Sequence, residues 1–325
     1  MNEAAINPTL HPAKRVKLSH STDSELPEEY SARVRVIEHD QFTTALRLVQ
    51  TQLSASSTIA VTIVKGNVGE FTGLRMVCLD PSKVSLVKAE VVADVDLQEA
   101  GSRPTITIRI RDFLDKLRGI PRCSSLLLYV CASGEMLEGL ATKGSVRRKF
   151  KLPLQSPIAG VEDLESLSCE FDVTISITAS SCTSIVTAAK SYESFIGFLL
   201  QQARENASAR FLTLTFDDEV AGSLSETFLS MVERDVDGDV HRVSSDITCE
   251  DALEKFTLQT SVPLTRYPAH KVCPFITKVP QGCAVSFRFN VGAASSGSPQ
   301  PLFMRYSDGQ NTVDCVIAPE VTPSS

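Results

Sequence analysis

The sequence predicts an α+β protein made of two similar halves, each with several antiparallel strands and two short helices. Strand-like segments alternate apolar and polar residues, as residues 105–110 do, and this is typical of antiparallel sheets with one buried face. Helical segments carry one apolar stripe each. The order of strands and helices in residues 31–152 recurs in residues 168–321, although the letters themselves do not repeat.

The composition is that of a soluble globular protein. The chain has 325 residues, 42% of them hydrophobic and 22% charged, which is enough for one large domain or two ordinary ones. It has no apolar run that could cross a bilayer, and its first residues lack the apolar core of a signal peptide. A net charge of −7 and an aromatic content of 6% argue against a wholly basic surface and against a stacking platform for single strands.

Residues 1–30 are predicted to form a disordered leader, because they hold prolines and polar residues with almost no apolar cluster. Within this leader, Lys14, Arg15 and Lys17 resemble a nuclear-localisation signal, whose cations fit acidic grooves on an import receptor. The sequence therefore predicts a nuclear protein. The alternative interpretation is a solvated charge run.

In the first half, residues 31–152, strand and helix patterns follow one another closely. Asp40 is predicted to cap a helix whose apolar stripe extends to Leu53, and a second helix is predicted at residues 112–118. Residues 73–91 form a predicted hairpin, because Asp80-Pro81-Ser82-Lys83 has turn chemistry. The other predicted strands are residues 33–37, 59–64, 105–110, 125–131, 136–142 and 146–152.

Residues 153–167 interrupt this rhythm with two prolines and a glycine, so we expect a connector between two domains. In the second half, residues 168–321, helices are predicted at 181–191 and at 269–279, the latter interrupted by Pro274. The predicted strands are residues 169–177, 194–202, 210–217, 225–233, 256–264, 283–290, 301–306 and 312–317. Residues 322–325 form a short tail.

Four segments have a specific wording. The most specific is the hairpin turn LDPSKVSLV at residues 79–87, followed by Ile317-Ala318-Pro319 near the C-terminus, the helix segment FITK at 275–278 and, more weakly, Pro301-Leu302. Together they resemble one family, the eukaryotic-type sliding clamps called proliferating cell nuclear antigen (PCNA). The leader, an insert at residues 234–246 and the lack of an acidic tail depart from the family pattern. The resemblance implies the DNA-clamp fold, in which helices line a ring and antiparallel sheets form its outer wall.

The resemblance also implies a ring that encircles double-stranded DNA, and such a ring slides only if it makes weak, non-specific contacts with phosphates. Candidate lining cations lie on or beside the predicted helices. They are Arg47, Arg111, Lys116, Arg118, Lys190, His270, Lys271 and Lys278. The first helix is less basic than is usual in the family, and each cation alone could be an ordinary surface charge.

Subunits of a clamp pair through edge strands, and the family predicts a homotrimer. The candidate interface residues here are Arg147, Arg148, Lys149 and Lys151 on one edge and Glu226 and Glu233 near the other. Opposite charge would favour head-to-tail association. The alternative is that charged edge strands only block aggregation.

Clamps recruit DNA polymerases and other proteins, which insert a short motif with a glutamine and two aromatic residues into a pocket beneath the connector, and they are loaded by a clamp loader. The matching positions are Leu79, Asp80, Pro157, Ile158, Val161, Pro301, Ile317, Ala318 and Pro319. For each position taken singly, a core role is the alternative.

Nothing in the sequence indicates catalysis. It contains no Walker A, GxGxxG, HExxH or GxSxG motif, and the five histidines have no triad-like spacing. The nine cysteines never form a CxxC pair, and residues 235–239, DVDGD, do not fit a calcium loop. We therefore predict a non-enzymatic sliding clamp without cofactor or metal; the alternatives are a subunit of a heterotrimeric checkpoint clamp and a non-ring DNA-binding scaffold.

Overall fold

The structure is a computed structural model. It describes residues 29–54, 57–118, 125–166, 171, 173–188, 195–203, 210–216, 219–225, 232–234, 240–242, 258–290 and 300–319. No helix within these ranges is both long enough and apolar enough to span a membrane.

The first half of the chain contains eight strands and two helices among its described residues. The strands are β1 (Tyr30–Val36), β2 (Thr58–Val64), β3 (Gly73–Leu79), β4 (Ser85–Leu97), β5 (Thr105–Arg109), β6 (Ser125–Cys131), β7 (Met136–Lys143) and β8 (Val146–Pro153). The helices are α1 (His39–Gln50) and α2 (Ile110–Arg118). Asp40 is not the N-cap that we predicted: Glu38 occupies that position, α1 begins at His39, and Asp40 lies in its first turn. There its carboxylate still lies near the positive end of the helix dipole.

The second half repeats this order after a connector that holds α3 (Val161–Ser166). Its helices are α4 (Ala179–Ala188) and α6 (Ala269–Lys278). Its strands are β9 (Val173–Thr178), β10 (Phe195–Ala203), β11 (Arg210–Phe216), β12 (Glu219–Ser225), β13 (Val232–Arg234), β14 (Val240–Arg242), β15 (Leu258–Pro268), β16 (Ala284–Phe289), β17 (Leu302–Ser307) and β18 (Thr312–Ile317).

One antiparallel sheet runs through both halves of the chain. Its strand order is β8-β7-β6-β1-β4-β18-β17-β16-β9, with β2, β3 and β5 branching from β4. The two halves join where β4 pairs with β18, from Ser85 opposite Ile317 to Glu90 opposite Thr312. Strand β4 can serve both halves because it is 13 residues long and its C-terminal part pairs instead with β1. A second sheet has the order β12-β11-β10-β15.

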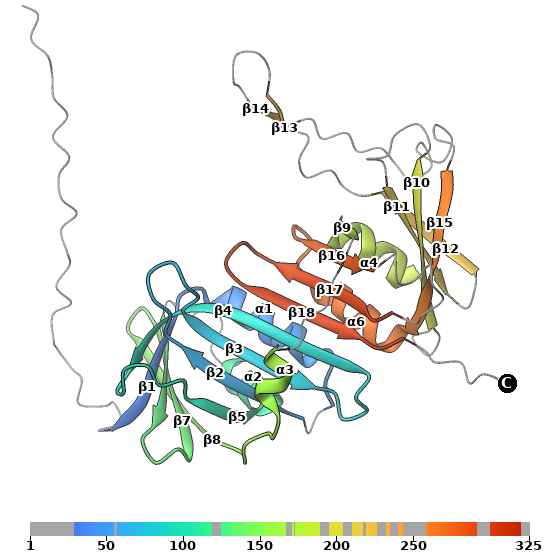
Figure 1. Cartoon of the computed structure of the whole chain (residues 1–325). Coiled ribbons are helices and arrows are strands. Elements are labelled where there is room, and N and C mark those ends of the chain that lie inside the picture. The colour runs from blue at the N-terminus through green and yellow to red at the C-terminus, as the bar shows by residue number, and fades with distance from the viewer. Residues whose placement is uncertain are drawn as a thin grey trace, which may run out of the picture.

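The helices bury their apolar stripes against the sheets. In α1 the buried side chains are those of Phe42, Ala45, Leu46, Leu48 and Val49. Phe42 meets Phe113 of α2 edge to face, with ring centroids 5.9 Å apart. Helix α1 also packs against α6, so the helices form a second contact between the halves. In Figure 1, α1 and α6 lie behind strands β4 and β18, whereas α3 lies in front of the sheet.

The structure contains elements that the sequence analysis did not predict. One is β12, which ends at Ser225, where we predicted a strand to begin; residues 226–231 of the strand predicted at 225–233 lie outside the described ranges. The sequence of β12, EVAGSLS, lacks a clear alternation and contains a glycine, so its pairing with β11 decides its structure. Another is α3, a short helix at residues 161–166 within the connector that we predicted at residues 153–167.

Candidate functional site

Most of the predicted DNA-binding cations lie on the face of the helices that is turned away from the sheets. Arg47 of α1, the basic residues of α2, and His270 and Lys278 of α6 are all exposed, while the apolar residues of these helices are buried. We call the set Arg47, Arg111, Lys116, Arg118, His270 and Lys278 the helix-face cations. Lys190, which we also predicted, lies outside the described residues.

The positive charge of this helix face is weak. Asp115 lies 3.2 Å from a guanidinium nitrogen of Arg118 and 4.0 Å from one of Arg111, so it offsets part of the charge of α2. Asp40 and Asp112 are also exposed on α1 and α2. Helix α4 carries no charged residue at all. Such a face would hold a polyanion only through a few dispersed contacts, as sliding requires.

Lys271 does not belong to this set, so our prediction for it needs correction. Its side chain is only 12% exposed, and its ammonium lies 3.1 Å from a carboxylate oxygen of Asp80. It also donates a hydrogen bond to the backbone carbonyl of Gln52, at 3.1 Å. A lysine held in this way has its charge offset inside the protein and has little left to offer to DNA.

Asp80 requires the complementary correction. We predicted it on the outer surface where partners dock, but it is 6% exposed and is the other half of the ion pair. Its carboxylate also accepts a hydrogen bond from the hydroxyl of Ser82. Asp80 is therefore a structural residue of the turn between β3 and β4.

Four of the other predicted docking positions gather at one end of the sheet: Leu79, Pro301, Ala318 and Pro319. Leu79 ends β3 and is 37% exposed, which is unusual for a large apolar side chain in this chain. Beside it the amide of Ala318 donates to the carbonyl of Val84 at 2.7 Å. Pro301 directly precedes Leu302, the β17 residue that pairs with Ile317, so Pro301 lies next to Ala318. We call Leu79, Val84, Pro301, Ala318 and Pro319 the docking surface.

The connector contacts the strand that leads to this surface. Helix α3 packs against β3, the strand that ends at Leu79. Pro157 is exposed, and Ile158 and Val161 are half-buried. Ile317, in contrast, is fully buried, because its side chain points into the core on the other face of β18. For Ile317 the core interpretation is correct.

Strand β8 is an edge of the long sheet, because among the described residues it pairs only with β7. Its Val146, Arg147, Arg148 and Lys149 are exposed, while Lys151 forms an ion pair with Glu138 of β7 at 2.5 Å. The long sheet ends on its other side at β9. The edge strand nearest in sequence to our predicted acidic edge is β12, which ends the second sheet and contains a single acidic residue, Glu219.

Neither predicted acidic interface residue can be placed on that edge. Glu226 lies outside the described residues, and Glu233 belongs to β13, which pairs with β14 in a separate two-stranded ribbon.

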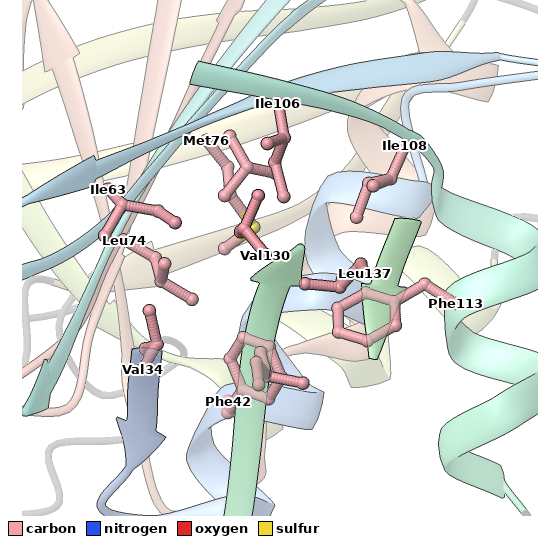
Figure 2. A pocket seen from close by; sticks show the side chains of 12 residues that line it. Val34, Phe42, Ile63, Leu74, Met76, Ile106, Ile108, Phe113, Val130 and Leu137 are labelled. Carbon is pink, nitrogen blue, oxygen red and sulfur yellow. The ribbon is translucent and has the colours of Figure 1, made fainter. Parts of the chain in front are cut away.

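A cavity of about 20 Å³ lies inside the first half, but it has the character of core and not of a ligand site. Figure 2 shows its lining side chains pointing toward one another from α1, α2 and several strands. They are all apolar: Val34, Phe42, Val61, Ile63, Leu74, Met76, Ile106, Ile108, Phe113, Leu128, Val130 and Leu137. A ligand site would also need a few convergent polar groups, and this cavity offers none.

The buried cysteines are not nucleophile candidates. Burial raises the pKa of Cys78 and of Cys273 to about 12, and it raises the pKa of Cys315 as well. Thiols with such pKa values remain protonated at neutral pH, and the thiolate is the reactive form.

Two buried polar residues that the sequence analysis missed hold the two halves together. Asn311, 2% exposed, accepts from the amide of Val92 at 2.9 Å and donates to Gln41 of α1 at 3.0 Å. Gln52, 1% exposed, donates to the carbonyl of Lys271 at 2.8 Å. Asn311 lies two residues after Gly309 and resembles an ordinary turn residue, so no local pattern distinguishes it.

No protein-family model matches this chain, and no curated protein sequence is significantly similar to it. The structure, however, is similar to solved clamp structures. Against the PCNA2–PCNA3 complex from Sulfolobus tokodaii the TM-score is 0.58, with 18% identity over 89% of this chain and 99% of that chain. PCNA from Entamoeba histolytica gives a TM-score of 0.60 with 13% identity, covering 90% of this chain and all of that chain.

A. fulgidus PCNA, solved with the C-terminal region of FEN-1 bound, gives a TM-score of 0.57 with 13% identity, covering 90% of this chain and all of that chain. At these identities the likeness concerns architecture alone. Three features of the fold already indicate this architecture: the doubled order of elements, the sheet that continues from β4 to β18, and the contact between helices of the two halves. The chain therefore has the PCNA-like clamp fold.

Proposed function

We propose that this protein is a non-enzymatic DNA clamp, which encircles duplex DNA as part of a ring and holds other proteins on it. The observation that carries the proposal is the separation of two faces on a clamp fold. The helix-face cations lie on the helix side of the sheet, and the docking surface lies where β3 and β18 end and β17 begins, near the connector helix α3. In such an arrangement, phosphate contacts and protein contacts do not compete for the same residues.

A primer-extension assay tests this function. A DNA polymerase copies a long primed template in the presence and absence of the protein and a clamp loader. We expect longer products per binding event when both are present, because a tethered polymerase rebinds the same template. Product lengths that do not change with the protein, at several protein concentrations, would contradict a processivity role.

Docking of other proteins forms the second part of the proposal. The neighbouring A. fulgidus PCNA was solved with a C-terminal region of FEN-1 bound, and here the docking surface offers an exposed Leu79 beside half-buried Ala318 and Pro319. A short peptide with one glutamine and two aromatic residues is the probe. Leu79→Ala should weaken its binding by at least about tenfold, because a buried leucine contact contributes roughly 1.5–3 kcal/mol.

The subunit composition of the ring is the third part of the proposal. Strand β8 offers basic residues, whereas β12 offers only one acidic residue, so charge complementarity between two copies of this chain is limited. A second candidate function follows from this mismatch: a subunit of a heteromeric clamp, such as a checkpoint clamp, whose other chain supplies an acidic edge. The neighbour from S. tokodaii is itself a complex of PCNA2 with PCNA3.

Light scattering of the purified chain separates these candidates. A homotrimeric mass that falls to the monomer on changing Arg147 and Arg148 to Glu supports a ring of identical subunits. A monomer that assembles only with other chains supports the heteromeric clamp. A mass that the double substitution leaves unchanged would reject β8 as an interface.

We further propose that the protein acts in the nucleus, on the resemblance of Lys14, Arg15 and Lys17 to an import signal. These residues lie outside the described ranges, so the proposal rests on the sequence alone. A fluorescent fusion of the whole chain should concentrate in nuclei. The same fusion with the three cations changed to Ala should lose this concentration.

A further inference from the structure

An ion pair between Lys271 and Asp80 joins a helix of the second half to a turn of the first half. Among the described residues it is the one ion pair that does so. The two side chains are 12% and 7% exposed, and their charged atoms are 3.1 Å apart. The lysine comes from α6, on the helix side of the molecule, and the aspartate follows directly on Leu79 of the docking surface. The pair thus connects the two faces through the junction between the halves.

The lysine end of this pair is fixed from several directions. The ammonium of Lys271 donates to the backbone carbonyl of Gln52 at 3.1 Å, and the side-chain amide of Gln52 donates back to the backbone carbonyl of Lys271 at 2.8 Å. Gln52 itself is buried, just beyond the end of α1. Because α1 and α6 pack against each other here, the ammonium has little freedom to move.

The aspartate end holds the turn. The carboxylate of Asp80 accepts from the hydroxyl of Ser82, while its backbone amide donates to the carbonyl of Ser85 at 2.9 Å and its carbonyl accepts from the amide of Lys83 at 2.7 Å. Lys83 has a φ of 58°, in the left-handed region that a lysine rarely adopts. Contacts around the turn must therefore offset a local strain.

A buried ion pair is a poor way to gain stability, since the cost of removing two charges from water often cancels their attraction. What such a pair does supply is a defined position, because any displacement leaves a buried charge without its partner. The position defined here is that of residues 79–84, which present Leu79 and Val84 at the docking surface.

We propose that Lys271 is a positioning residue for partner docking: through Asp80, it holds the β3–β4 turn in the conformation that presents Leu79 to a partner. This inference rests on the proposed docking function. It assigns to α6 two separate roles, with exposed Lys278 at the helix face and buried Lys271 serving the opposite surface.

The test compares Lys271→Met, which keeps the length of the side chain and removes its charge, with Lys271→Arg, which keeps the charge. The full-length chain is titrated against a synthetic peptide that carries one glutamine and two aromatic residues. We expect Lys271→Met to raise the Kd about tenfold and Lys271→Arg to restore most of the affinity. Hydrogen exchange at the amides of Asp80 and Lys83, which close the turn, should become faster in Lys271→Met and not in Lys271→Arg.

Controls separate this inference from the function on which it rests. If Leu79→Ala weakens peptide binding but Lys271→Met does not, the positioning role is wrong and the docking surface stands. If the wild-type chain does not bind the peptide, the docking function is wrong, and the exchange rates alone decide whether Lys271 holds the turn. Should Lys271→Met fail to fold, Asp80→Asn removes the charge from the other side and keeps the shape. An unchanged Kd together with unchanged exchange rates in that variant overturns the proposal.

Discussion

At the scale of single residues, the side chain opposite on the neighbouring strand often decides which side chains a position can hold. Gly139 of β7 faces Phe150 of the edge strand β8, and a Cβ atom at Gly139 would lie only 2.0 Å from the end of the phenyl ring. Phe150 is 7% exposed, and its ring centroid lies 6.2 Å from that of Phe113, so the ring of Phe150 is confined on both sides. The glycine therefore makes room for the aromatic residue that anchors the edge strand to the core.

Replacing Gly139 by Ala should accordingly lower the free energy of unfolding by about 1–3 kcal/mol, the usual cost of overpacking. Thermal or denaturant unfolding measures the effect. Gly282 is the matched control, because a Cβ atom there would meet nothing within 4 Å. Gly282→Ala should be neutral or slightly stabilising. Equal effects of the two substitutions would show that Phe150 does not confine position 139.

The buried thiols predict how stability depends on pH. In the folded chain burial raises the pKa of Cys78 and Cys273 to about 12, while an unfolded cysteine titrates near a pKa of about 8.5. The folded state thus keeps protons that the unfolded state loses. The contribution of these two thiols to the free energy of unfolding is complete below about pH 8.5. It is lost as the pH rises toward 12, by up to about 1.4 kcal/mol per pH unit for each thiol.

Denaturant unfolding at pH 7 and at pH 10 tests this prediction. The wild-type chain should lose stability between the two values. Cys273→Ala, although less stable at both, should lose less between them, because one titrating thiol is gone. An identical pH dependence in wild type and variant would argue against deprotonation of Cys273 in the unfolded state.

At the scale of elements, regular patterns in the sequence were enough for most of the fold. The apolar stripe of α1, the alternation in β5 and the turn chemistry at Asp80 correctly indicated a helix, a strand and a hairpin. Strand β12 was missed because its structure depends on its pairing with β11 and not on its own pattern. The ion pair of Lys271 was missed for a related reason: no local feature of α6 distinguishes a lysine that meets Asp80 from one that meets solvent.

Helix α2 carries the densest set of helix-face cations, so it is the element on which to test DNA binding. Changing both Lys116 and Arg118 to Ala should weaken binding of duplex DNA and reduce the slope of log K against log salt by about 1 for each phosphate that the variant no longer neutralises. Both residues are exposed, so folding should not change. A filter-binding or polarisation titration at several salt concentrations measures the slope.

Lys83→Ala is the matched control for this experiment, because Lys83 is an exposed cation on the β3–β4 turn, away from the helices. It should leave both affinity and slope unchanged. If Lys83→Ala and the α2 variant reduce binding equally, the binding of DNA depends on overall charge and not on the helix face.

At the scale of the whole molecule, the two halves are joined by backbone pairing and by buried side chains at each end of that pairing. Near one end of the β4–β18 junction lies the Lys271–Asp80 pair, with Gln52 beside it. Near the other end lies Asn311, which reaches β4 and α1 from the turn before β18. The sequence predicted two similar halves, but it could not predict this junction, because each of these polar interactions joins residues that are far apart along the chain.

Asn311 should therefore control how cooperatively the halves unfold. Asn311→Ala removes the acceptor for the amide of Val92 and the donor for Gln41, and an unpaired buried amide costs about 1–3 kcal/mol. Because this cost falls on the junction, denaturant unfolding should broaden or separate into two transitions when it is monitored at different probes. Asn67→Ala, at an exposed loop whose asparagine bonds only locally to Glu70, is the control and should shift one sharp transition only slightly. A single sharp transition in Asn311→Ala, shifted no more than in the control, would mean that the β4–β18 pairing alone couples the two halves.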